Sequence, residues 1–265
     1  MTDPAHPETP HPETPRPVAL VTGVGRVAGL GAAIAEDLAL GGWDVAFSYW
    51  SAYDARMSWG PQPDDPARVA EAVARGGGRA LAVEADLMDT DAAERILEAV
   101  EQALGPVTAL VLSHAEGVDS SLLETSVESL ERHLAVNVRA SLQLIQGFAR
   151  RYRAVPGAGR IIALTSDHVV GNVPYGASKA ALDRIVIAAA RELEDVRITA
   201  NLVDPGPIDT GWFTPEIRAH LQETTPRGRL AEPRDAAALV CFLASAEGGW
   251  INGQRIRSDG GQSVG

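Results

Sequence analysis

Short apolar runs alternate with longer amphipathic segments along most of this chain of 265 residues. We predict strands at residues 17–22, 43–49, 79–84, 107–112, 159–164, 197–203 and 253–258. The first of them is apolar on both faces, which is typical of a parallel strand covered on both sides. Helices are predicted between them, over residues 32–40, 67–75, 89–104, 126–148, 175–193 and 232–245. Strands separated by helices predict βαβ units, so the fold class is α/β, doubly wound, with a mainly parallel sheet and helices on both faces.

The two ends of this pattern define the domain organisation. Residues 1–16 contain His-Pro-Glu-Thr-Pro twice and nothing apolar to bury, so we expect a disordered Pro-rich tail. No linker interrupts residues 17–265, which we expect to form one domain. Within it, residues 50–66 are rich in Trp, Tyr, Pro and Asp and are predicted to be a long loop. The helix at 89–104 has Asp89 or Thr90 as its expected N-cap.

A glycine-rich turn, Gly23-Val24-Gly25-Arg26-Val27-Ala28-Gly29-Leu30-Gly31, joins the first strand to the first helix. Glycines in this context let the backbone approach a pyrophosphate, and the helix N-terminus supplies amides and a positive dipole end. An ordinary turn between strand and helix is the alternative. The strand before and the helix after favour a dinucleotide site, and hence a Rossmann-type domain.

Tyr175 and Lys179 stand four residues apart in a predicted helix, so their side chains share one face. A free phenol has a pKa of about 10, and an ammonium group one turn away lowers it. A proton carrier works best when its pKa is close to the working pH. The pair therefore indicates an acid–base group, supported by the hydroxyls of Thr165 and Ser166 at the end of the preceding strand.

Composition and charge exclude several classes of function. The formal charge of -12, from 35 acidic and 23 basic residues, argues against a nucleic-acid surface. The single cysteine, Cys241, cannot form an internal disulfide, and a cytoplasmic location is expected. We find no signal peptide and no apolar run long enough to span a membrane. His114 and His168 have no metal-ligand spacing around them, so no metal is expected.

Several motifs follow one another in a recognisable order: Thr22-Gly23 with Gly29 and Gly31, Asp86-Leu87, Asn137, Ser166, Tyr175 with Lys179, Asp204-Pro205-Gly206, and Ile251-Asn252-Gly253-Gln254 with Asp259-Gly260-Gly261. Together they resemble the short-chain dehydrogenase/reductase family over residues 17–262, and its 3-oxoacyl-[acyl-carrier-protein] reductases most. The resemblance implies a catalytic set of Asn137, Ser166, Tyr175 and Lys179. It implies cofactor contacts from Gly23, Gly25, Arg26, Gly29, Leu30, Gly31, Asp86, Leu87, Ser113, Ala115, Tyr175, Lys179, Pro205, Gly206, Ile208 and Thr210.

The glycine turn departs from the family pattern because it is two residues longer between Gly23 and Gly29. Alternatively, Gly25, Gly29 and Gly31 keep the usual spacing and the Thr-Gly pair is displaced. After the fourth strand, Ser113-His114-Ala115-Glu116 replaces the family's Asn-Asn-Ala-Gly. We expect His114 to line the cofactor pocket.

A third departure lies before the tyrosine. Ser166 precedes Tyr175 by nine residues, fewer than is usual in the family, so the loop 167–174 is shortened. Thr165 is the alternative to Ser166 as the catalytic hydroxyl. His168 is expected at the mouth of the cleft.

The implied reaction is hydride transfer between a nicotinamide and a ketone, 3-oxoacyl group or secondary alcohol. Tyr175 would exchange the proton and Ser166 would hydrogen-bond the same oxygen. Lys179 would keep the phenol acidic and hold the nicotinamide ribose, and Asn137 would anchor a water. We prefer NADP over NAD, because the place of the usual acid, about 20 residues beyond the glycine turn, holds Ser48, Tyr49 and Trp50. Arg26 is suited to the 2′-phosphate, whereas Asp54 reaching back would favour NAD.

Other readings of the chain stay open. A silent family-like protein that binds the cofactor as a sensor or scaffold is one, and an enoyl reductase is another. The substrate is expected to be a small carbonyl or alcohol, covered by Trp212 and Phe213 unless these pack against the body.

The helices 126–148 and 175–193 resemble the pair through which family members form dimers and tetramers, so we expect a homo-oligomer. The same apolar residues would equally serve as core.

Overall fold

One parallel sheet of seven strands organises the structure, a computed structural model that describes residues 15–264. The tail predicted for residues 1–16 therefore lies, apart from its last two residues, outside the described part. The strand order is β3-β2-β1-β4-β5-β6-β7. The strands are β1 Val18–Thr22, β2 Asp44–Tyr49, β3 Ala80–Glu84, β4 Val107–Leu112, β5 Arg160–Leu164, β6 Thr199–Asp204 and β7 Arg255–Arg257. Their number, sequence and parallel pairing confirm the predicted fold class.

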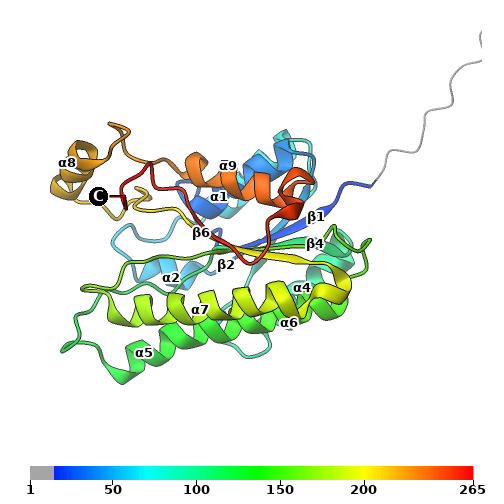
Figure 1. The fold of residues 1–265 in the computed structure, drawn as a ribbon, viewed down its shortest axis with the longest axis horizontal. Coiled ribbons are helices and arrows are strands. Elements are labelled where there is room, and N and C mark those ends of the chain that lie inside the picture. Colours follow the sequence, from blue (N-terminus) through cyan, green and yellow to red (C-terminus); the bar gives the residue numbers. More distant parts are fainter. Residues whose placement is uncertain (1–14, 265) are drawn as a thin grey trace, which may run out of the picture.

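Helices cover both faces of the sheet (Figure 1). One layer contains α1 Leu30–Leu40, α3 Asp65–Arg75 and α9 Pro233–Ala244, and the other contains α4 Ala92–Ala103, α6 Ser141–Arg151 and α7 Val173–Glu192. Each layer encloses its own cluster of buried aliphatic and alanine side chains against the sheet. Burial of this apolar surface is the main stabilising contribution to the fold.

Two short helices lie outside the helices predicted from the sequence. Residues 50–66 include α2 Ser51–Ala55 and the start of α3, and α8 Pro215–Thr224 follows β6. The sequence carried a signal for α8, because Thr214 caps it by accepting a hydrogen bond from the amide of Ile217. Proline at the first helical position adds to that signal. The N-cap of α4 is Asp91 rather than Asp89 or Thr90, and its side chain makes no capping hydrogen bond.

The long helix predicted over 126–148 consists of three continuous parts. α5 Val127–His133 begins after Ser126, whose hydroxyl accepts from the amide of Ser129. A π-helical stretch, Leu134–Ala140, follows and then passes into α6. Such widened turns are frequent at functional sites. This one contains Asn137.

Strand order reverses where β1 lies beside β4, and in open parallel sheets ligands bind at the carboxyl ends of strands at such a point. The glycine-rich turn after β1 and the segments after β4, β5 and β6 all reach this edge. Along the described residues, no helix combines the length and apolarity needed to cross a bilayer.

Candidate active site

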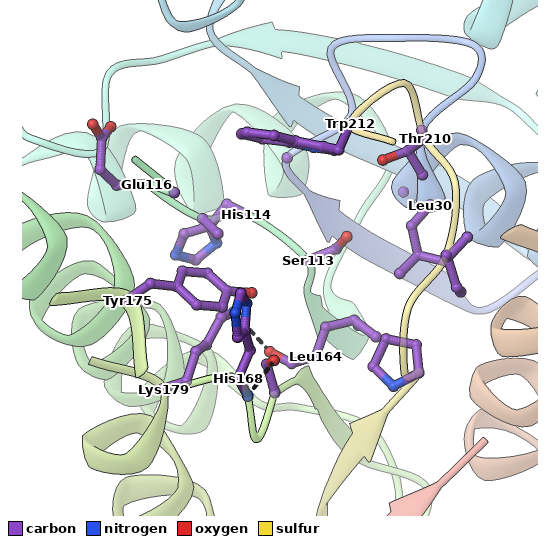
Figure 2. Close-up of a pocket in the computed structure, with 18 of the residues that line it drawn as sticks. Leu30, Ser113, His114, Glu116, Leu164, His168, Tyr175, Lys179, Thr210 and Trp212 are labelled. Carbon is purple, nitrogen blue, oxygen red and sulfur yellow. Dashed lines mark hydrogen bonds between the residues drawn. The ribbon is translucent and has the colours of Figure 1, made fainter. Parts of the chain in front are cut away.

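A cavity of about 1020 Å³ opens at the carboxyl ends of the strands. All the site residues predicted from the sequence, apart from Asn137, line this cleft. They come from segments far apart in the chain: the glycine-rich turn, the ends of β3, β4 and β5, the start of α7, and the segment after β6. Figure 2 shows Tyr175, Lys179 and His114 on one side of the cleft and Trp212 and Thr210 on another.

The glycine-rich turn forms one wall of the cleft with no room for side chains at two positions. Gly23 directly follows β1 with φ +78, and a Cβ there would lie 2.5 Å from Cα of His114. A Cβ on Gly31 would lie 3.0 Å from the carbonyl oxygen of Gly23. Gly29 is the N-cap of α1 and offers no side-chain cap, so the first amides of the helix remain available to an anion. This wall fits the diphosphate of a dinucleotide.

Tyr175 and Lys179 lie on one face of the first turns of α7, as their spacing predicted. The ring of Tyr175 points into the cleft, and Nζ of Lys179 is 5.5 Å from its centroid (Figure 2). Lys179 is only 2% exposed, and its ammonium donates to the carbonyl oxygen of Leu164 at 2.8 Å. The end of β5 therefore fixes the ammonium beside the phenol.

The pKa of Tyr175 differs in direction from the sequence-based expectation. Burial, together with the charges of Asp204 and Asp119, raises the pKa of the phenol to about 12. Burial also lowers the pKa of Lys179 to about 8, against the opposing charge of Asp183. The expectation of a lowered phenol pKa was wrong for this structure, because desolvation outweighs the neighbouring ammonium. At neutral pH the phenol is protonated.

The two candidate hydroxyls at the end of β5 point in different directions. The hydroxyl of Thr165 is buried and donates to the carboxylate of Asp183 on α7. Ser166 is partly exposed, and its Oγ accepts from the amide of His168 at 3.1 Å. Oγ of Ser166 therefore remains free to donate its own proton into the cleft.

Asn137 is fully buried and lies behind the cleft wall rather than in it. Its Nδ2 donates to the carbonyl oxygen of Glu116 and to Oγ of Ser178, both at 2.9 Å, and its Oδ1 accepts from the amide of Glu116. The side chain thus ties the segment after β4 to α7. Its backbone carbonyl accepts from the hydroxyl of Ser141.

His114 is buried at the bottom of the cleft in a complete hydrogen-bond network. Its Nε2 lies 3.1 Å from the carbonyl oxygen of Val136, which can only accept, so Nε2 carries a proton. Nδ1 then accepts from the hydroxyl of Thr22 at 2.6 Å. Burial, and secondarily the charge on Lys179, lowers the pKa of His114 to about 3, so the imidazole is neutral.

Arg26 links three segments around the cleft. Its Nε is 3.6 Å from the carboxylate of Asp54, its guanidinium lies 3.9 Å from the ring centroid of Trp59, and its Nη1 donates to the carbonyl oxygen of Thr210 at 2.7 Å. Trp59 also packs edge-to-face on Trp212, with ring centroids 4.6 Å apart. The glycine-rich turn, the segment around α2 and the segment after β6 therefore meet at one cluster.

The sequence-based analysis did not identify several side chains of the cleft. Tyr53 of α2 lines it, and Arg56 makes two hydrogen bonds to the buried carboxylate of Glu116. Asn172, in the shortened loop, also lines it. The aromatic content of residues 50–66 was the available signal, since exposed loops rarely concentrate Trp and Tyr.

The comparisons with known proteins agree with this geometry. A family profile described as enoyl-(acyl carrier protein) reductase matches residues 23–263. The uncharacterised oxidoreductase YjdA of Bacillus subtilis is 35% identical over 92% of this chain and 96% of its own. The NADPH-dependent aldehyde reductase-like protein of Arabidopsis thaliana chloroplasts is 36% identical over 92% and 93%. A short-chain dehydrogenase from Burkholderia cenocepacia, solved with NADP, superposes with a TM-score of 0.82 at 33% identity, covering 93% of this chain and 97% of its own.

Proposed function

The chain belongs to the short-chain dehydrogenase/reductase family of oxidoreductases, and we propose that it reduces carbonyl groups with NADPH. One observation carries this proposal. The protonated phenol of Tyr175, the hydroxyl of Ser166 and the ammonium of Lys179 line the same cleft as the glycine-rich turn. A proton donor and a dinucleotide cradle are the two parts that carbonyl reduction requires.

When bound, NADPH supplies the hydride. The crowded backbone at Gly23 and Gly31 and the open amides of α1 fit its diphosphate. Asp86 and Leu87 after β3 would contact the adenine, and Pro205 and Gly206 after β6 would border the nicotinamide. Lys179 and Tyr175 would reach the adjoining ribose.

The protein's own groups handle the proton and the charge on oxygen. Tyr175 would donate its proton to the carbonyl oxygen as negative charge develops there. Ser166 would donate a hydrogen bond to the same oxygen, which stabilises the transition state more than the ground state. The ammonium of Lys179, held by the carbonyl oxygen of Leu164, would stabilise the phenolate that Tyr175 becomes after donating its proton. Because the pKa of Tyr175 is raised, the phenol holds its proton at neutral pH, which is the form needed for a proton donor in the reduction direction.

Asn137 would act from behind the cleft wall. By holding both backbone groups of Glu116, it would keep the segment after β4 in place beside Tyr175. We retain the proposal that it also anchors a water on the proton path.

NADP is supported over NAD by the position of the rival acid. Asp54 is buried, receives a hydrogen bond from Nε1 of Trp59 and pairs with Arg26. Its charge is therefore compensated within the protein rather than presented to a ribose hydroxyl. The relatives named for NADPH or solved with NADP support the same choice.

The substrate class is proposed as ketones, aldehydes and 3-oxoacyl groups. The matched profile names enoyl reductases, and the lengthened glycine turn of this chain also resembles theirs. We favour carbonyl reduction because Tyr175 and Lys179 are four residues apart, whereas enoyl reductases separate them further. Oxidation of NADPH with a 3-oxoacyl thioester, a 2-enoyl thioester and simple aldehydes as substrates distinguishes these activities.

We also propose that the protein forms a homo-oligomer, up to a tetramer. Val127 at the start of α5 and Ile187 of α7 are 71% and 40% exposed, and Leu123 in the turn before α5 is 96% exposed. These side chains give this side of the protein an apolar outer surface. A reducing, cytoplasmic setting accords with the unpaired Cys241.

A Tyr175→Phe variant tests the proposed function. It should still bind NADPH, weakened by no more than about tenfold through loss of one hydrogen bond to the ribose. It should lose at least about a hundredfold in kcat, since proton transfer contributes that much or more. Calorimetry establishes cofactor binding, and absorbance of the reduced nicotinamide measures turnover. Retention of turnover would exclude Tyr175 as the proton donor. Binding of NADPH without turnover of any carbonyl or enoyl compound by the wild type would favour the sensor or scaffold function.

A further inference from the structure

Hydrogen bonds join the end of strand β5 to helix α7 at two consecutive residues, Leu164 and Thr165. The carbonyl oxygen of Leu164 accepts from Nζ of Lys179, and the hydroxyl of Thr165 donates to the carboxylate of Asp183. Tyr175, Lys179 and Asp183 follow one another at intervals of four residues, so they share one face of α7. The residue after Thr165 is Ser166.

Asp183 is a half-buried carboxylate. Its side chain is 14% exposed, and Oδ2 lies 3.5 Å from Nη1 of Arg255 on β7. The same guanidinium donates to Asp204 at 2.7 Å, at the end of β6. Arg257 bridges Asp204 and Asp167 on the outer side. Asp183 therefore belongs to a charge network below the cleft, and not to the cleft lining.

Lys179 is a buried cation whose compensating charge must come from this network. The charged and titratable groups facing Lys179 and Asp183 are Tyr175 of α7, the neutral His114 after β4, Asp204 of β6 and Arg255 of β7. Of these, the carboxylate of Asp183 is the one that favours the charged form of Lys179. A buried ammonium without a compensating carboxylate would lose its proton.

The shortened loop 167–174 makes these contacts more important. A short connection between β5 and α7 restricts how Ser166 and Tyr175 can approach each other, and the two strand-end contacts fix the remaining freedom. We propose that Asp183 is a positioning residue for the reaction, which holds Ser166 against Tyr175 through Thr165 and maintains the ammonium form of Lys179. This rests on the proposed function for its catalytic consequence, but not for its effect on Lys179.

Lys179 is the only lysine in the sequence, so its titration can be followed directly. Protein grown with lysine labelled with carbon-13 at Cε gives a single lysine resonance, whose chemical shift reports protonation. We would titrate the wild type, Asp183→Asn and Glu192→Gln. Glu192 is an exposed carboxylate on the last turn of α7, so its variant removes the same charge far from the site.

Asp183→Asn keeps an oxygen for the hydroxyl of Thr165 and removes the charge. We expect the pKa of Lys179 to fall by about one unit, with no change in Glu192→Gln. The alkaline limb of kcat/KM should move to lower pH by the same amount, while activity near pH 6 stays close to that of the wild type. Equal titration of Lys179 in all three proteins would overturn the electrostatic part of the proposal, whatever the substrate.

Variants of Thr165 test whether Asp183 positions Ser166, because they leave the charge of the Asp183 carboxylate in place. Thr165→Val should lower kcat about tenfold or more, leave the binding of NADPH and the titration of Lys179 unchanged, and be rescued by Thr165→Ser. Unchanged kcat in Thr165→Val would overturn it.

If Asp183→Asn does not fold, Arg255→Gln decides the electrostatic part, because it removes the cation facing Asp183 and should raise the pKa of Lys179. An unchanged or lowered pKa in that variant would contradict it.

Discussion

The guanidinium of Arg26 and the carboxylate of Asp54 face each other across the cofactor end of the cleft, with Nε and Oδ1 3.6 Å apart. The two residues were rival indicators of cofactor choice when only the sequence was considered. Their pairing means that they act together, since the acid compensates the base instead of competing with it. Trp59 completes the arrangement by covering Arg26 and donating to Asp54.

Arg26→Ala should weaken the binding of NADPH and leave that of NADH nearly unchanged. Loss of a charge-assisted contact to the 2′-phosphate costs about 1.5–3 kcal/mol, which is roughly tenfold to a hundredfold in Kd. Calorimetric titration with both cofactors measures the difference. Arg75→Ala on the outer surface of α3 is the control. Equal weakening of both cofactors would show that Arg26 acts only as a structural link.

Trp59→Ala should raise the Kd for NADPH about tenfold and accelerate its release. The ring contacts Arg26 and Trp212, and such aromatic contacts contribute roughly 0.5–2 kcal/mol. Stopped-flow measurement of cofactor release tests this. Trp250→Ala provides the control, because Trp250 is 98% exposed. Unaltered release in Trp59→Ala would mean that the cluster does not retain the cofactor.

Gly23→Ala and Gly60→Ala form a matched pair, since both residues have positive φ, +78 and +68. An added Cβ at Gly60 meets nothing within 4 Å, so only the backbone conformation is penalised, by about 1 kcal/mol. At Gly23 it also meets the backbone of His114. We therefore expect Gly23→Ala to lose more unfolding free energy than Gly60→Ala, measured by urea unfolding, and to bind no NADPH. Similar stability and cofactor binding in the two variants would contradict the close approach seen here.

The buried, neutral His114 should make the stability of the folded protein depend on pH. Its pKa is lowered to about 3 in the folded protein, below the unfolded value of about 6.5. The unfolded state therefore binds the additional proton first, and stability is lost as the pH falls below about 6.5, by up to about 1.4 kcal/mol per pH unit. His114→Asn should show a shallower loss between pH 6 and 4.5 in urea unfolding. His220→Asn, an exposed change on α8, should follow the wild type; identical curves for all three would refute the prediction.

Strands such as β1 and β4 were predictable because they are short, largely apolar runs between turn residues. Tyr175 and Lys179 were predictable because their spacing is itself the signal. The contacts between Arg26, Asp54 and Thr210 were not predictable, since they join segments up to 184 residues apart and no periodicity encodes such pairs. The sequence pattern also identified Asn137 but did not predict the direction in which its side chain points. Only the π-helical turn and the partners at Glu116 show that its amide points into the protein and away from the cleft.

Lys179 also determines how the protein responds to chemical modification. Apart from the histidines, every other basic side chain in the sequence is arginine, so acylating reagents find no lysine on the outer surface. Their access to Lys179 depends on exposure of the inner end of the cleft. The rate of acylation of this one side chain, compared with and without NADPH, would therefore report how often the enzyme opens.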